Sequence, residues 1–226
     1  MSEPERARLE KVYNGYRSSG RSTERWDPDA IGNRSILAER QLGISNLLNG
    51  LTPGSRILEI GCGAGEVLAQ LKQSVPRSTA VFGIDLLADR LSRADARKAG
   101  AVAQADGRSI PFRNGQFNLV AMFTVLSSVL DPMLRQELAN EAIRVLAPGG
   151  AILWYDLRMP STNRSVRPLR RRALQSLFAG CTVQVQSTTL LPPLARRLGQ
   201  REEALYSRLA RVPVLRTHLL GLIRRP

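Results

Sequence analysis

Three glycines at alternate positions, Gly61, Gly63 and Gly65, follow an apolar run that contains a single acid, Glu59. An apolar pattern with helical spacing resumes after the glycines. A strand, a tight glycine turn and a helix in this order form the first unit of a doubly wound α/β sheet, and such a turn lets the backbone approach a ligand closely. A dinucleotide fingerprint requires glycine at position 66, where this chain has Glu66. An acid there would repel a pyrophosphate, so the turn predicts a cationic nucleoside ligand without phosphate.

Further acids close the apolar runs that follow. Asp85 ends the run 80–84 and lies twenty residues beyond Gly65, where Rossmann-type folds place an acid on the ribose hydroxyls. Asp106 ends the run 101–105 in the same way. Because ligands of doubly wound sheets bind beyond the carboxyl ends of the strands, these acids are expected at one edge, near the glycine turn.

With these features the chain resembles class I S-adenosylmethionine-dependent methyltransferases over about residues 55–156. The core is similar to the ubiquinone and menaquinone methyltransferase type, and the stretches 154–158 and 216–223 are similar to bacterial methyltransferases of glycan or secondary-metabolite pathways. The resemblance implies S-adenosyl-L-methionine as cofactor, S-adenosyl-L-homocysteine as product, and no metal. It places Glu59 near the cofactor's amino group and Asp106 near the adenine. The other cofactor-binding candidates are Gly61, Cys62, Gly63, Gly65, Asp85, Leu86, Gly107 and Phe123.

The expected fold is a Rossmann-like, seven-stranded, doubly wound α/β sheet. Strands are predicted at 55–60, 80–85, 101–105, 117–123, 151–156, 181–187 and 217–223, and the resemblance implies that the last of them is antiparallel. Residues 1–50 are expected to form an N-terminal helical cap, with Tyr13, Tyr16, Trp26 and Arg34 as lid candidates, and residues 51–226 the methyltransferase domain.

A basic helical insertion is predicted at about 189–215, between the last two strands. The spacing of Leu205, Leu209 and Val212 predicts an amphipathic helix with these side chains inward. Arg196, Arg197, Arg201 and Arg208 are expected to face solvent or an anionic acceptor, and the segment is expected to roof the acceptor pocket.

The net charge of +14 is concentrated near the C-terminus: residues 157–226 contain 14 arginines and two glutamates. A basic segment suits an anionic acceptor, an anionic membrane surface contacted peripherally, or RNA. Amino-methylating enzymes of DNA usually carry Asn/Asp-Pro-Pro-aromatic after the fourth strand, whereas residues 124–127 read Thr-Val-Leu-Ser, which makes nucleic acid the less favoured substrate. The two cysteines show no metal or disulfide pattern, and we expect a cytoplasmic protein of undetermined oligomeric state.

Asp156 and His218 are the candidate catalytic residues. Asp156 ends a predicted strand at the ligand edge, and His218, the single histidine, begins the last strand at that same edge. Either side chain would serve as general base if the acceptor is a hydroxyl. The sequence therefore predicts a methyltransferase acting on the oxygen of a small-molecule or glycan-like acceptor, anionic and lipid-linked acceptors included. An RNA methyltransferase and a non-catalytic S-adenosylmethionine-binding protein are the alternatives.

Overall fold

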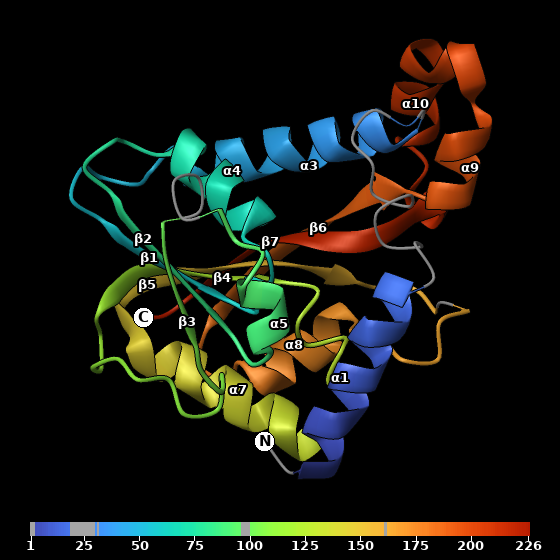
Figure 1. Cartoon of the computed structure of the whole chain (residues 1–226). Coiled ribbons are helices and arrows are strands. Elements are labelled where there is room, and N and C mark those ends of the chain that lie inside the picture. The colour runs from blue at the N-terminus through green and yellow to red at the C-terminus, as the bar shows by residue number, and fades with distance from the viewer. Residues whose placement is uncertain (1–2, 19–29, 31, 96–99, 161) are drawn as a thin grey trace.

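A computed structural model describes residues 3–18, 30, 32–95, 100–160 and 162–226, and these form a seven-stranded sheet in the order β3-β2-β1-β4-β5-β7-β6 (Figure 1). The strands are β1 Arg56–Ile60, β2 Ala80–Asp85, β3 Ala101–Gln104, β4 Phe117–Phe123, β5 Leu146–Leu157, β6 Thr182–Leu190 and β7 Arg216–Arg224. β1 to β5 run parallel, and β7 runs antiparallel to both β5 and β6. The predicted doubly wound sheet with its antiparallel last strand is confirmed.

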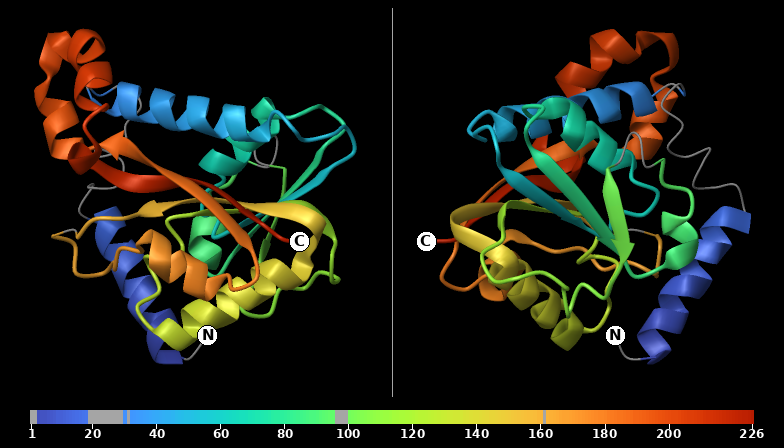
Figure 2. Two further views of the ribbon diagram at one scale, coloured as in Figure 1. Left: turned by 180° about the vertical axis from the view of Figure 1, so that it is seen from behind. Right: turned by 60° about the vertical axis from the view of Figure 1, so that its left-hand side comes forward.

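Helices cover both faces of the sheet (Figure 2). One face packs against α3 (Asn33–Leu48) and α4 (Glu66–Ser74) through a core that includes Ile44 and Leu68. The other face packs against α7 (Pro132–Val145) and α8 (Arg171–Leu177) through a core that includes Leu138 and Phe178. β4 and β5 lie between the two layers, which explains why their apolar runs are almost uninterrupted.

Two predicted strands have an end that differs by more than one residue in the structure. β5 begins at Leu146 rather than at residue 151, because Leu146 pairs with Phe117 across an irregularity in the β4–β5 ladder. β6 ends at Leu190 rather than at residue 187. β6 is an edge strand whose exposure alternates along its first six residues, as expected for a strand with one solvent-facing side.

The segment between β6 and β7 is helical, as predicted. It consists of α9 (Pro192–Arg197), the short 3₁₀ turn η1 (Gly199–Arg201), α10 (Glu202–Leu209) and a second 3₁₀ turn, η2 (Pro213–Leu215). Figure 1 shows it projecting from the end of the molecule where β6 ends and β7 begins, beside the start of α3. Its core is a separate apolar cluster whose members are Ile36, Leu190, Ala195, Tyr206 and Ala210.

The predicted inward face of this segment is partly wrong. Leu205 and Leu209 are half-buried, but Val212 is exposed, because Tyr206 and Ala210 occupy the positions that face α3. Arg196 is also half-buried, and its Nε donates to Asn33 Oδ1 over 3.0 Å, so this guanidinium faces α3 rather than solvent.

Residues 1–50 supply two helices that lie in different places. α1 (Glu3–Ser18) crosses the end of the molecule below the sheet, whereas α3 lies along the opposite face (Figures 1 and 2). α1 is tied to the segment after β4, since Arg8 Nη2 donates to the Ser128 carbonyl and Glu5 Oε1 accepts from Leu130 N. The division into a cap of 1–50 and a domain of 51–226 stays a prediction.

In the described part of the chain no helix has the length and apolarity needed to cross a bilayer.

Candidate active site

A cavity of about 100 Å³ lies between α1 and the carboxyl ends of the parallel strands. Its wall contains five residues that the sequence predicts to bind a cofactor: Gly61, Asp85, Leu86, Gly107 and Phe123. The other lining residues are mostly apolar: Leu9, Tyr13, Ile60, Ile84, Leu87, Arg90, Ala105, Thr124, Val125, Ser128, Val129 and Leu138. The structure thus brings half of the predicted cofactor-binding residues together around one partly open cavity, whereas Glu59, Cys62, Gly63, Gly65 and Asp106 do not line it.

The glycine turn is built as its sequence predicts. Gly61, Gly63 and Gly65 have φ values of 76°, 55° and 82°, in the left-handed region that side chains disfavour. The amides of Gly61 and Cys62 both donate to the Ile84 carbonyl, at 2.7 and 3.0 Å, which ties the turn to the end of β2. A side chain at Gly61 would collide with Val125 across the cavity wall, so glycine keeps the space open.

Asp85 organises the floor of the cavity. Its Oδ1 accepts from Leu87 N at 2.9 Å, and its Oδ2 accepts from Gly63 N at 2.8 Å. Oδ2 also accepts from Arg90 Nη1 at 3.0 Å in a largely buried ion pair. The carboxylate that is expected to bind the ribose hydroxyls therefore already accepts hydrogen bonds from two backbone amides and from Arg90. Of these donors, the long Arg90 side chain is the one that a ligand could displace.

Arg90 connects this floor to α1. Its guanidinium lies 4.3 Å from the centre of the Tyr13 ring and packs directly against the backbone of Gly63. Arg17 of α1 also pairs with Asp89, at 3.4 Å, on α5 (Ala88–Leu91). A ligand that binds Oδ2 of Asp85 would therefore displace Arg90, and the Tyr13 ring would lose its contact with the Arg90 guanidinium. The prediction that Tyr13 belongs to a lid over the site agrees with this position.

Glu59 is the buried acid beneath the turn. It is 2% exposed, and its Oε2 has no hydrogen-bond partner among the described residues. Burial, followed by the nearby Glu66, raises the pKa of this carboxyl to about 8. A buried acid without a partner costs free energy and marks a functional site. A cationic group placed beside it would both ionise it and satisfy Oε2, which fits the ammonium of S-adenosylmethionine.

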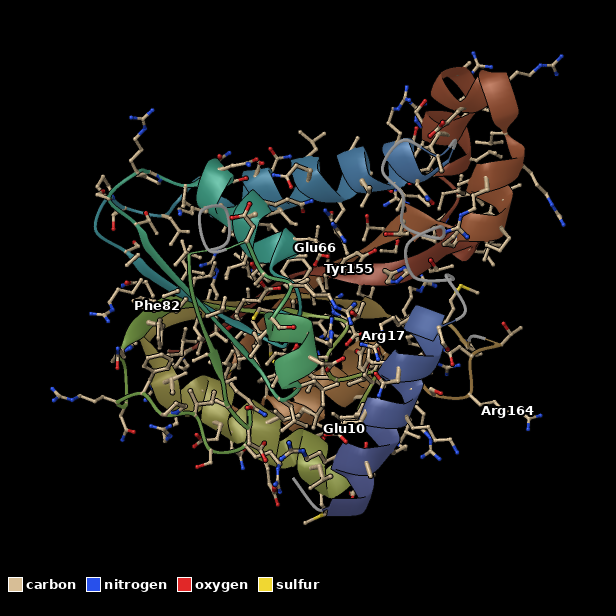
Figure 3. All side chains as sticks on the ribbon, in the orientation of Figure 1. Glu10, Arg17, Glu66, Phe82, Tyr155 and Arg164 are labelled. Atoms are coloured by element: carbon tan, nitrogen blue, oxygen red, sulfur yellow. The ribbon has the colours of Figure 1, made fainter. Side chains whose placement is uncertain are left out.

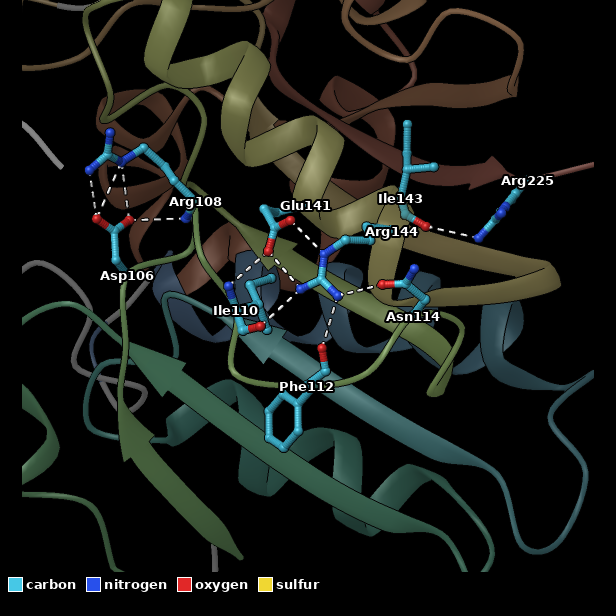
Figure 4. A network of polar contacts seen from close by, with 9 residues as sticks. All are labelled: Asp106, Arg108, Ile110, Phe112, Asn114, Glu141, Ile143, Arg144 and Arg225. Atoms are coloured by element: carbon cyan, nitrogen blue, oxygen red, sulfur yellow. Dashed lines mark hydrogen bonds and ion pairs between the residues drawn. The ribbon is translucent and has the colours of Figure 1, made fainter.

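Asp106 lies between Ala105 and Gly107 of the cavity wall and is bound by Arg108 (Figure 4). Its carboxylate accepts from the backbone and guanidinium of Arg108, with a shortest distance of 2.8 Å. Arg144 of α7 holds the loop that follows, donating to the carbonyls of Ile110 and Phe112 at 2.9 Å each. These hydrogen bonds tie the loop that bears Asp106 and Gly107 to α7, beside the predicted adenine site.

Asp156 is placed differently from the sequence expectation of a base over the pocket. It is fully buried and does not line the cavity. Its Oδ2 accepts from Ser127 N at 2.9 Å and its Oδ1 from Leu157 N at 2.8 Å. Burial raises the pKa of Asp156 to about 6. Both oxygens thus fasten the segment after β4 to the end of β5.

His218 lies next to this region, on β7. Its ring stacks on Tyr155 with 4.8 Å between centroids and 5° between planes, and Tyr155 lies 5.9 Å from Phe123 of the cavity wall. Nδ1 of His218 is 2.9 Å from Thr217 Oγ1. Burial, assisted by Arg40, lowers the pKa of His218 to about 3, so the imidazole is neutral and a weak base in this structure, and it does not line the cavity. Figure 3 shows Tyr155 in the interior of the molecule.

Among the cavity residues that sequence reasoning missed, Thr124 and Arg90 bear most on the chemistry of the site. Thr124, directly after β4, has a φ of 55°, which is rare for a β-branched residue and typical of functional strain. Arg90 was missed because its role depends on long-range contacts with Gly63 and Tyr13, although its position on the helix after Asp85 is a usable signal. Of the other lid candidates, Tyr16 meets Asn163, Arg34 is exposed at the start of α3, and Trp26 falls outside the described residues.

The strand order, the glycine turn and the acids at the strand ends define the fold of class I methyltransferases. Residues 57–150 match the family model described as "Methyltransferase domain". These residues carry a methyltransferase domain of the class I, S-adenosylmethionine-dependent type, and S-adenosylmethionine is the cofactor of that family.

The relatives differ in what their names say they act on. The 2-phytyl-1,4-naphtoquinone methyltransferase of Trichormus variabilis is 30% identical over 165 residues, covering 70% of this chain and 64% of that protein. The 27-O-demethylrifamycin SV methyltransferase of Amycolatopsis mediterranei is 28% identical over 163 residues, which cover 67% of this chain and 53% of that protein. The chain therefore spans about half to two thirds of these curated relatives.

Among solved structures, the Haloferax volcanii complex between the Trm112 methyltransferase activator and a putative methyltransferase contains a similar chain. The match has a TM-score of 0.66 at 16% identity and covers 95% of this chain and 97% of that one. At this identity the likeness concerns the fold alone.

Proposed function

We propose that the protein transfers a methyl group from S-adenosylmethionine to a hydroxyl of a small, largely apolar acceptor. The observation that carries the proposal is the cavity, which joins the cofactor-binding residues to an apolar wall formed by Leu9, Phe123, Val125, Val129 and Leu138. Apolar walls bury an apolar ligand, and the few polar groups orient it. The printed names of the two curated relatives, one for a phytylated quinone and one for an oxygen of rifamycin, support an acceptor of this kind.

The protein's own groups have distinct parts in binding the cofactor. Asp85 would hold the ribose after Arg90 leaves its Oδ2, Glu59 would accept from the ammonium, and Gly107 would flank the adenine with Asp106 beside it. The bound cofactor supplies a methyl group activated by a sulfonium. The remaining task of the protein is alignment, which by itself accounts for a large part of the rate of a displacement reaction.

The acceptor hydroxyl attacks the methyl carbon as the carbon–sulfur bond breaks, and its proton leaves for a base. We assign that base to His218, the predicted base, whose ring is held by stacking on Tyr155 close to Phe123 of the cavity wall. Asp156 is better suited to positioning, because both of its oxygens already bind backbone amides. Thr124, at the cavity wall, would contact the acceptor near the methyl group.

The test combines binding and turnover. Calorimetric titration with S-adenosylhomocysteine should show one site per chain, and radiolabelled methyl transfer should be found with hydroxylated naphthoquinones or polyketide phenols. His218→Gln should reduce kcat about a hundredfold, within the usual range for a general base, and leave cofactor affinity unchanged. Thr217→Val, which removes the hydroxyl beside Nδ1 together with its hydrogen bond to the Thr189 carbonyl, is the matched control. Full turnover in His218→Gln would refute the base assignment, and failure to bind the cofactor would refute the proposal itself.

A further inference from the structure

The β6–β7 insertion has an exposed apolar joint at its base. Three of the five exposed large apolar side chains in the described part of the protein lie there: Leu191, Val212 and Val214, exposed by 39%, 41% and 66%. The joint is a single structural unit, because Leu191 N donates to the Leu215 carbonyl at 2.8 Å and Leu215 N donates to the Val212 carbonyl at 3.0 Å. We call these three side chains the insertion rim.

Exposed arginines surround the rim in sequence. Arg197, Arg201, Arg208 and Arg211 are all exposed, and none of them has an ion-pair partner among the described residues. The acid of α10 whose side chain is described, Glu202, is turned toward α3, where it accepts from Ser35 N at 2.9 Å. Figure 3 shows long side chains with nitrogen tips extending from the α9–α10 segment into solvent. The outer surface is therefore both apolar and cationic.

The rim lies at the edge of the sheet that bears the active site. Arg158, immediately after β5, donates from Nη1 to the Pro213 carbonyl at 3.2 Å and from its backbone to the Thr217 carbonyl at 3.0 Å. Figures 1 and 2 place the insertion and the end of α1 at this same end of the molecule. The insertion does not line the cavity, however, so its exposed face is not explained by contact with an acceptor held there.

We propose that the insertion rim and its arginines dock the protein on an anionic lipid bilayer, with the open edge of the sheet toward the lipid. In such a surface the apolar side chains of the rim would contact the acyl chains, and the arginines around them would contact the anionic headgroups. RNA fits less well, because stacking on bases requires exposed aromatic rings and the aromatic ring of the segment, Tyr206, is buried. The inference goes beyond the proposed methyl transfer and does not depend on it.

The test is flotation of the full chain with vesicles. Binding is expected to vesicles of phosphatidylcholine mixed with phosphatidylglycerol and not to phosphatidylcholine alone. Val212→Ser combined with Val214→Ser should weaken binding at least about tenfold. Arg208→Gln combined with Arg211→Gln should weaken it about 25-fold, roughly fivefold per basic residue.

Matched control variants distinguish binding through the insertion rim from nonspecific apolar and electrostatic binding to vesicles. Met133→Ser removes a side chain that is 71% exposed on α7, and Arg170→Gln with Arg172→Gln removes two exposed charges beside α8; both should leave binding unchanged. Unaltered circular dichroism and cofactor binding would show that each variant is folded. Absence of binding to anionic vesicles, or equal loss in the controls, would overturn the proposal. So would rim-dependent binding to RNA at physiological salt, or rim-dependent dimerisation, in place of vesicle binding.

Discussion

Replacing Glu59 by glutamine should stabilise the protein while weakening cofactor binding. The carboxyl is 2% exposed, and burial raises its pKa from an ordinary value of about 4.5 to about 8. For an acid whose folded-state pKa is raised, the unfolded state ionises first as the pH increases. The contribution of the protonated Glu59 to the free energy of unfolding is therefore fully present below about pH 4.5 and is lost as the pH rises toward 8.

The magnitude follows from the slope of this loss. Between the two pKa values each pH unit costs about 1.4 kcal/mol, so the native protein loses roughly 2–3 kcal/mol through Glu59 between about pH 5 and pH 7. The glutamine variant does not titrate and keeps that stability. Its cofactor affinity should fall about 10- to 100-fold, because a charge-assisted hydrogen bond to the ammonium is lost.

The assay is urea unfolding of the ligand-free protein at both pH values, followed by calorimetric titration with the cofactor. Glu66→Gln is the matched control, since Glu66 follows the same turn but is exposed, and a much smaller pH-dependent gain is expected. Equal loss of stability in the Glu59→Gln variant and the original protein would refute the burial argument. Unchanged cofactor affinity would refute the assignment of Glu59 to the ammonium.

Three further predictions concern the floor and the supports of the site. Arg90→Met should bind S-adenosylmethionine about tenfold more tightly in calorimetry, because the ion pair with Asp85 no longer competes; weaker binding would mean that Arg90 contacts the cofactor. Gly63→Ala and Gly54→Ala should each destabilise the protein by about 1–2 kcal/mol in urea, because both glycines have positive φ. Only Gly63→Ala should abolish cofactor binding, since Gly63 lies in the glycine turn and its amide binds Asp85, whereas Gly54 lies outside the site. Asp156→Asn should cost about 1–3 kcal/mol in the same unfolding assay, because an amide can accept from only one of the Ser127 and Leu157 amides through its single oxygen; full stability would contradict the fastening role.

Local patterns predicted the fold well because its elements are encoded locally. The runs ending at Asp85 and Phe123 are buried strands in the structure, and the turn glycines adopt the positive φ that their type suggests. The start of β5 was predicted less accurately, since the Phe117–Leu146 pairing depends on a ladder irregularity that no local signal shows.

The contacts that individual side chains make could not be predicted from the sequence. Asp156 was expected over the pocket because it ends a strand, but whether a strand-end acid faces a ligand or a backbone amide depends on the neighbouring loop, here Ser127. Val212 was expected inward because spacing describes one helix, whereas α10 ends at Leu209 and the chain turns before Val212.

The most direct test of the central claim is a crystal structure with S-adenosylhomocysteine. The account predicts the nucleoside in the cavity beside Gly61 and Gly107, its ribose on Asp85, its amino group within reach of Glu59, and Arg90 displaced from the Asp85 carboxylate. A nucleoside bound elsewhere, or bound in the cavity with the Arg90–Asp85 ion pair intact, would contradict it.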